Sequence, residues 1–248
     1  MLILVTNDDG IYAPGLQALA KSLKGLGRIV VVAPDREQSA VSHALTLHRP
    51  LRITALGQNR FAVDGTPADC VTLGVNEILK KKPDLIISGV NCGGNMGNDV
   101  HYSGTVSAAI EGVLMKIPAV AVSLVAEDDT HPYFETAARV ACRILPKLLP
   151  ILQRRSVAIN INVPNRPYHR LKGLQLTELG QRDYGNILFQ KVDPRGKKYY
   201  WISGDRNSFA RIQGTDCVAV GLGRVSITPL RVDLTEHQVL NELQTLKL

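Results

Sequence analysis

The sequence predicts an α/β fold, a Rossmann-like three-layer sandwich whose central sheet is mostly parallel. Two patterns in residues 1–165 predict it. Short apolar runs recur without polar alternation, as is typical of parallel strands covered on both faces. Segments with helical periodicity separate these runs, and parallel strands need such crossover connections. A chain of 248 residues can bury a full core, so we expect residues 1–248 to form a single domain.

The predicted strands and helices alternate along this region. Leu2–Thr6 is the first apolar run, and Pro14 stands where a helix can begin, with Gly25 and Gly27 after its last apolar position. Residues 45–55 alternate apolar and polar side chains, which predicts a strand pair or a hairpin. We expect further strands at residues 28–33, 84–90, 119–124 and 157–163, and further helices at residues 66–80, 105–115 and 134–149.

The pattern changes after about residue 165. Short β-like segments at residues 174–179, 199–202 and 225–230 precede a helix at residues 236–246. We interpret residues 1–165 as the core that holds the active site, and residues 166–248 as sheet additions plus β-hairpin and helical arms for oligomerisation. The last helix carries an apolar stripe that either its own subunit or a partner must cover, formed by Val239, Leu240, Leu243 and Leu246.

The composition is that of an ordinary globular protein, with 45% hydrophobic and 21% charged residues. The 29 basic and 22 acidic residues leave a net charge of +7, but the basic residues are scattered and only 5% of residues are aromatic. A nucleic-acid groove combines basic and stacking residues, so we expect solvated lysines and no specific nucleic-acid partner, with a binding tract as the alternative.

The chain shows neither a secretory pattern nor a long apolar stretch, which predicts a cytoplasmic protein without a membrane span. The four cysteines lie far apart and lack CxxC spacing. We therefore expect reduced, buried thiols rather than a zinc site or a disulfide framework at Cys70, Cys92, Cys142 and Cys217.

The loops after the predicted strands are rich in oxygen ligands and small residues. Asn7-Asp8-Asp9-Gly10 follows the first strand, and ligands of open α/β sheets bind at the carboxyl ends of strands. Adjacent carboxylates repel each other unless a cation lies nearby. Oxygen ligands suit Mg²⁺, Mn²⁺ or Ca²⁺ better than zinc. The alternative is that Asp8-Asp9-Gly10 is only a turn.

A candidate anion site follows the loop at residues 91–99, which comes after the predicted strand at residues 84–90. Ser103-Gly104-Thr105 has the form of a helix N-terminus, whose free N–H groups and dipole attract anions, although Ser103 can equally be an ordinary N-cap. Gly93-Gly94 permits close backbone approach to a ligand, and Asn95 adds a neutral donor. A cation beside an anion pocket suits phosphoester hydrolysis, because the metal activates water while backbone donors hold the phosphate oxygens.

Ordered motifs extend along nearly the whole chain: VTNDDG at residues 5–10, VVAPDREQSA at 31–40, GTPADCV at 65–71, SGVNCGGNMG at 88–97, YSGTVSAA at 102–109, NINVPN at 160–165 and VSITPL at 225–230. These motifs resemble those of the SurE family of metal-dependent nucleotidases. The resemblance implies a Rossmann-like fold. It also implies hydrolysis of nucleoside 5′- and 3′-monophosphates, and dimers or tetramers that exchange C-terminal elements.

The resemblance also implies roles for individual residues. One divalent metal ion per subunit, Mg²⁺ or Mn²⁺, would be held by Asp8, Asp9, Ser39 and Asn91, with Asp8 and Asp9 as the catalytic carboxylates. The phosphate would be held by Asn95, Ser103, Gly104 and Thr105. From residue chemistry alone, Asp35 and Glu37 look like stronger ligands than Ser39; the resemblance favours solvated loop acids there. Family members often carry proline at the position of Gly94, so this loop should be slightly less rigid.

Other function classes fit less well. A dinucleotide-binding oxidoreductase needs GxGxxG after the first strand, where this chain has NDDGIYAPG. A haloacid-dehalogenase-type phosphatase needs a D-x-D pattern, whereas these two aspartates are adjacent. A non-enzymatic nucleotide-binding regulator with the same pocket stays open. His43, His48 and His101 are candidate general acids or bases but more often structural, and Tyr102 is a candidate for stacking on a base or for core packing.

Overall fold

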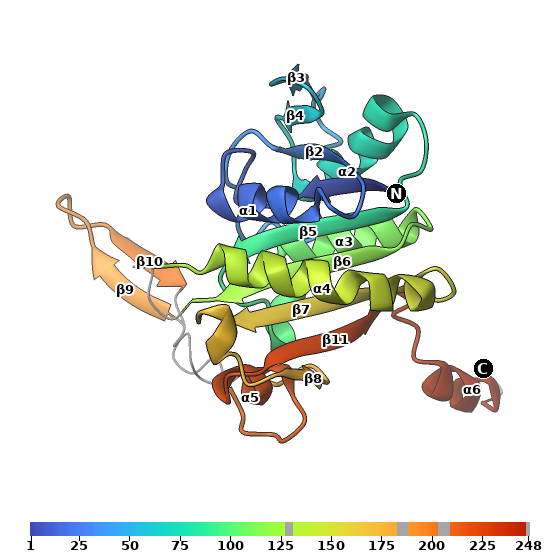
Figure 1. The fold of residues 1–248 in the computed structure, drawn as a ribbon. Helices are drawn as coiled ribbons and strands as arrows, with labels where there is room; N and C mark the ends of the chain where they lie inside the picture. The colour runs from blue at the N-terminus through green and yellow to red at the C-terminus, as the bar shows by residue number, and fades with distance from the viewer. Residues whose placement is uncertain (127–130, 183–187, 203–208, 247–248) are drawn as a thin grey trace.

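A nine-stranded mixed sheet forms the centre of the protein (Figure 1). The computed structural model describes residues 1–126, 131–182, 188–202 and 209–246. The strands in spatial order are β3 (Ile53–Ala55), β4 (Arg60–Val63), β2 (Arg28–Pro34), β1 (Leu2–Thr6), β5 (Leu85–Cys92), β6 (Ala119–Val125), β7 (Val157–Pro164), β11 (Val225–Arg231) and β8 (Leu174–Leu176). All pairs are parallel except β3 with β4 and β7 with β11. The predicted α/β three-layer architecture with a mostly parallel sheet is confirmed.

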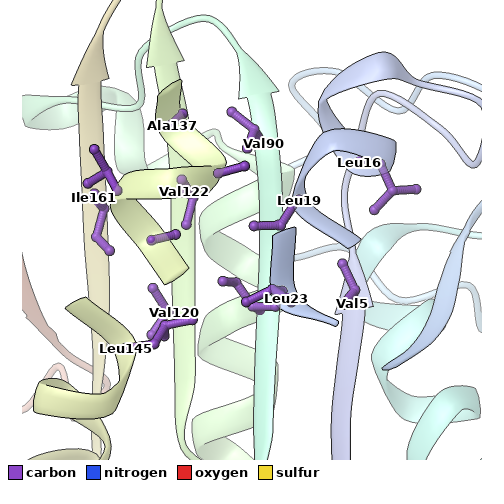
Figure 2. Close-up of a cluster of buried hydrophobic side chains, with 14 of the residues drawn as sticks. Val5, Leu16, Leu19, Leu23, Val90, Val120, Val122, Ala137, Leu145 and Ile161 are labelled. Carbon is purple, nitrogen blue, oxygen red and sulfur yellow. The ribbon is translucent and has the colours of Figure 1, made fainter. Parts of the chain in front are cut away.

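Helices cover both faces of this sheet. On one face, α1 (Pro14–Leu23) packs beside α4 (Phe134–Leu152), and the other face carries α2 (Pro67–Leu73) and α3 (Gly104–Leu114). Figure 2 shows Leu16, Leu19 and Leu23 of α1 beside Ala137 and Leu145 of α4, packed over Val5, Val90, Val120, Val122 and Ile161 of the strands. Truncating one of these fully buried leucines to alanine typically costs about 2–5 kcal/mol.

The strand order reverses at β1. The chain passes from β1 to β2 on one side and then returns to place β5 on the other side of β1. The loops that leave β1 and β5 therefore diverge at the carboxyl edge, and such a switch point leaves a crevice for a ligand. The predicted candidate loops lie at this edge.

The segment at residues 45–55 differs from the prediction. Only Ile53–Ala55 is a strand, and it pairs antiparallel with β4, a strand that the sequence analysis missed. Ahead of it, the backbone N–H of Thr46 donates to Asp69 Oδ1 and the carbonyl of Ala44 accepts from Thr66 Oγ1. The side chains of the α2 cap thus form the hydrogen bonds with the backbone of Ala44 and Thr46 that a neighbouring strand would form in a hairpin.

The predicted helix at residues 66–80 is divided. Thr66 and Asp69 form a capping box at the start of α2, with Pro67 in the first turn. Residues Gly74–Leu79 then continue as a π-helix. The other predicted helices and core strands of residues 1–165 lie within a few residues of their expected ends. A short helix, α5 (Asp216–Gly221), and a strand, β9 (Leu188–Val192), were not predicted.

Two elements of the C-terminal region stand apart from the sheet. The strand β9 pairs only with β10 (Lys198–Ile202) among the described strands, and this hairpin projects from the body in Figure 1. The helix α6 (His237–Gln244) lies on the other side of the molecule, and every described residue of it is exposed. Its stripe is 48, 41, 47 and 55% exposed at Val239, Leu240, Leu243 and Leu246. Within one subunit, nothing in the described residues covers this stripe.

No helix among the described residues combines the length and apolar character that a membrane span requires.

We expect these elements to assemble subunits, because an exposed apolar stripe gains stability when a partner buries it and exchanged elements suit symmetric oligomers. The intact protein should be a dimer or tetramer at micromolar concentration, and truncation before Thr235 should weaken or abolish the assembly. Light scattering of both proteins measures this directly. A monomeric intact protein would contradict the arm interpretation.

Candidate active site

A cavity of about 440 Å³ opens at the carboxyl ends of β1 and β5. Six of the eight predicted site residues line it: Asp8, Asp9, Ser39, Asn91, Asn95 and Ser103. These residues lie at the carboxyl ends of three strands, β1, β2 and β5, or in the segments that follow them, so the switch point of the sheet brings them together. Further lining residues are Glu37, Ala40, Cys92, Gly94, Asp99 and Tyr102.

The turn after β1 fixes the backbone that carries the two aspartates. The side chain of Asn7 is fully buried and donates to the carbonyl of Gly10 at 3.0 Å, which closes the turn. Gly10 has φ +98°, and a Cβ there would lie 3.2 Å from the carbonyl carbon of Arg36. The next loop is attached to this turn, because the N–H of Gln38 donates to the carbonyl of Asp8 at 2.8 Å.

Asp8 is held by the N-terminus of α3. The backbone N–H of Thr105 donates to Asp8 Oδ2 at 3.0 Å, and the Thr105 hydroxyl donates to Asp8 Oδ1. Gly104 permits this approach, since a Cβ there would lie 3.0 Å from both Cβ and Oδ2 of Asp8. Ser103 caps the helix by accepting from the N–H of Val106 at 3.1 Å. Burial nevertheless raises the pKa of Asp8, against the opposing effect of the Thr105 bonds.

Asp9 reaches across to β5. Its Oδ2 accepts from the backbone N–H of Cys92 at 3.2 Å. Burial, followed by repulsion from the Asp8 carboxylate, raises the pKa of Asp9 to about 7. A cation between the two carboxylates would lower the pKa of both Asp8 and Asp9, because it stabilises their ionised forms.

Asn91 faces the same cavity because of an irregularity in β5. The register with β6 shifts between Gly89 and Asn91, and a bulge of this kind re-aims the side chain that follows it. The amide nitrogen of Asn91 donates to the carbonyl of Gly93 at 2.9 Å. Its Oδ1 is thereby left as an acceptor or a metal ligand.

Ser39 and Glu37 face the cavity from the loop after β2. The Ser39 hydroxyl donates to Glu37 Oε1 at 2.6 Å. The sequence analysis interpreted Glu37 as a solvated loop acid. It is exposed, and it also lines the cavity beside the predicted ligand. Asp35 is exposed, pairs with Arg36 at 3.9 Å and does not line the cavity.

The backbone and side chain of Asn95 are fixed by two strands. Its N–H donates to Asn162 Oδ1 at 2.9 Å and its Nδ2 donates to Ser123 Oγ at 2.8 Å. The carbonyl of Asn95 accepts from both Asn160 and Asn162. The sequence analysis did not assign these supporting residues. For Asn160 and Asn162, polar side chains two positions apart in an otherwise apolar buried strand were the signal.

Other predicted residues lie outside the cavity lining. Gly104 and Thr105 are buried beneath it, and the backbone N–H and the hydroxyl of Thr105 both donate to Asp8. Their role toward phosphate stays a prediction. None of His43, His48 and His101 lines the cavity, whereas Tyr102 does so with 59% of its surface exposed.

The prediction of four buried thiols is wrong for most of them. None of the four cysteines is joined in a disulfide, but only Cys70 is buried. Cys92 is exposed because it is the last residue of β5, where the strand ends at the cavity.

The residues at this site fit a hard divalent cation. Among the described residues no lysine, arginine or histidine lines the cavity, while four carboxylates do. One of these, Asp99, is paired with Arg182. In the described part of the chain, no group of three His, Cys, Asp or Glu side chains is arranged to hold a metal. A cation here would depend on two carboxylates supplemented by neutral oxygens, which is a ligand set for Mg²⁺ or Mn²⁺ rather than zinc.

Comparison with known proteins decides the family. The sequence profile described as "Survival protein SurE" matches residues 3–186. The chain belongs to the SurE family. It is 52% identical over 248 residues to a protein named 5′-nucleotidase SurE from Geobacter sulfurreducens, across 99% of this chain and 93% of that protein. It is 51% identical to the protein of the same name from Geotalea uraniireducens, across 100% and 98% of the two chains.

A solved structure confirms the fold of this SurE chain. The crystal structure of the SurE protein from Aquifex aeolicus matches with a TM-score of 0.88 and 44% identity over 98% of each chain. The family resemblance predicted from the sequence motifs is therefore confirmed along essentially the whole length.

The raised pKa of Asp9 gives a stability prediction for metal-free protein. Because folding raises this pKa from 3.8 to about 7, the carboxyl lowers folding stability progressively as pH rises through that window. The Asp9→Asn variant keeps the side-chain size and an acceptor for the Cys92 N–H. It should be more stable than the parent at pH 8 by about 1–3 kcal/mol, with the difference disappearing near pH 4.

Urea unfolding with chelator present, at both pH values, measures this difference. A variant that is less stable at pH 8, or equally shifted at both pH values, would show that Asp9 is not held in an unfavourable charged state.

Proposed function

We propose that this protein is a divalent-metal-dependent phosphomonoesterase that hydrolyses nucleoside 5′-monophosphates, and also 3′-monophosphates, to nucleoside and phosphate. The observation that carries the proposal is the pair of adjacent carboxylates, the buried Asp8 and the half-buried Asp9, in a cavity that no lysine, arginine or histidine of the described residues lines. The names of the similar SurE proteins support the nucleotidase activity and the 5′-ester.

In this proposal Asp8, Asp9, Ser39 and Asn91 hold one Mg²⁺ or Mn²⁺ ion. A bound cation of this kind lowers the pKa of a water molecule and neutralises charge on the phosphate. The chain's own contribution is orientation: α3 fixes Asp8 through Thr105, and the end of β5 fixes Asp9. These carboxylates therefore do not have to reorganise when a substrate arrives.

The phosphate is proposed to lie between Asn95 and the N-terminus of α3. Asn95 is immobilised by Asn162 and Ser123, so its remaining amide hydrogen keeps a fixed direction. The N–H of Gly104, in the first turn of α3, has no acceptor within its own helix, and the helix dipole favours an anion there. Ser103 and Thr105 complete this predicted phosphate site.

The alternative is a non-enzymatic regulator that binds a nucleotide in the same cavity. Metal-dependent phosphate release distinguishes the two, since a regulator would bind nucleotide without turnover. The assay covers 5′- and 3′-nucleoside monophosphates with Mg²⁺, with Mn²⁺ and with chelator. Release with a metal and none with chelator is the expected result.

Replacing Asp8 or Asp9 by asparagine should abolish metal-dependent release, while the fold is kept. Loss of several kcal/mol of transition-state stabilisation corresponds to roughly a thousandfold in kcat/KM. Asp35→Asn is the matched control, because Asp35 is an exposed acid of a neighbouring loop outside the cavity. Turnover near that of the parent in either site variant would refute the assignment, as would an equal loss in Asp35→Asn.

A further inference from the structure

The segment that carries Ser39 has no regular secondary structure, and its conformation is unusual. Ala40 and Ser42 both have φ 55°, in the left-handed region that non-glycine residues rarely adopt. Such residues persist where their surroundings hold them. The position of Ser39 in the cavity therefore depends on the contacts that fasten this segment.

Two residues, one on each side of Ser39, fasten the segment to the site region through three hydrogen bonds. The N–H of Gln38 donates to the carbonyl of Asp8 at 2.8 Å. On the other side of Ser39, the N–H of Ser42 donates to the carbonyl of Tyr102 at 3.1 Å and its hydroxyl donates to the carbonyl of His101 at 2.6 Å. The acceptors of the Ser42 bonds belong to the exposed residues His101 and Tyr102, where water can compete.

A further contact is better shielded and comes from His43. Its Nε2 lies 2.8 Å from Glu111 Oε2 on α3, and their side chains are 30% and 14% exposed. Glu111 is itself fixed, because its Oε1 accepts from the Thr72 hydroxyl of α2 at 3.2 Å. The hydrogen bond from His43 holds the pKa of Glu111 below its usual range, so this acceptor is a carboxylate.

The helix α3 thus has two attachments to the site. Thr105 at its first turn holds Asp8, and Glu111 two turns later holds the segment of Ser39 through His43. His43 does not line the cavity, and its Nε2 is engaged with Glu111. These observations argue against the role of general acid or base that the sequence left open for it.

We propose that His43 is a positioning residue that acts through Glu111 to hold Ser39 beside Asp8 and Asp9, and so sets the affinity of the site for its divalent cation. This inference rests on the proposed function, in which Ser39 is a metal ligand. Partners one step removed from a metal ligand typically change metal affinity by roughly 10–100-fold when removed.

The test compares three variants of the full-length protein: His43→Ala, His43→Gln and His48→Ala. Glutamine can still donate to Glu111, so it should restore the contact. His48 is an exposed histidine of the same loop and does not line the cavity, which makes it the matched control. Mn²⁺ binding is measured by calorimetry, and hydrogen exchange of residues 38–46 is measured in metal-free protein.

We expect His43→Ala to weaken Mn²⁺ binding roughly tenfold and to speed exchange in residues 38–46. His43→Gln and His48→Ala should stay within about threefold of the parent for Mn²⁺. At saturating Mn²⁺, kcat of His43→Ala should return to near the parent value. A residue that transferred protons would instead lower kcat at every metal concentration.

Equal Mn²⁺ affinities in His43→Ala and the parent would overturn the inference, as would a His43→Gln variant as weak as the alanine variant. If His43→Ala does not fold, the glutamine variant still tests the inference. Mn²⁺ binding more than about threefold weaker than that of the parent, or faster exchange in residues 38–46, would overturn it. A parent protein that bound no Mn²⁺ would instead refute the proposed function. The exchange of residues 38–46 would then show separately whether His43 fastens the segment.

Discussion

The structure depends on how the chain holds two adjacent carboxylates, one buried and one half-buried, at the end of one strand. Asp8 is 5% exposed, and both Asp8 and Asp9 have a raised pKa because burial disfavours their charged forms. No lysine, arginine or histidine in the described residues pairs with either of them. An arrangement of this kind is unfavourable unless a ligand supplies positive charge.

The remainder of the fold can be understood as support for this pair. The reversal of strand order at β1 opens the crevice, and α3 turns its N-terminus toward Asp8, where a side chain at position 104 would crowd the Asp8 carboxylate. The bulge in β5 directs Asn91 into the same space, and the buried asparagines of β7 hold Asn95. The site is therefore assembled by sheet topology rather than by one continuous motif.

Much of this arrangement could be predicted from the sequence, for physical reasons. Parallel strands buried on both faces are almost uniformly apolar, so the core strands and the loops after them were recognisable. The segment at residues 45–55 was not, because side chains of the α2 cap replace a strand partner there. The bonds from Thr105 to Asp8 were also out of reach, since contacts across 97 positions leave no local pattern. Six of the predicted site residues share one cavity; which of them bind metal and which bind phosphate stays a prediction.

Anomalous diffraction from crystals of the intact protein grown with Mn²⁺ tests the central claim most directly. The account predicts one strong Mn²⁺ peak per subunit, coordinated by both Asp8 and Asp9, with Ser39 and Asn91 completing the protein ligands. A peak held instead by Glu37 and Asp99, or no peak at this cavity at saturating Mn²⁺, would contradict it.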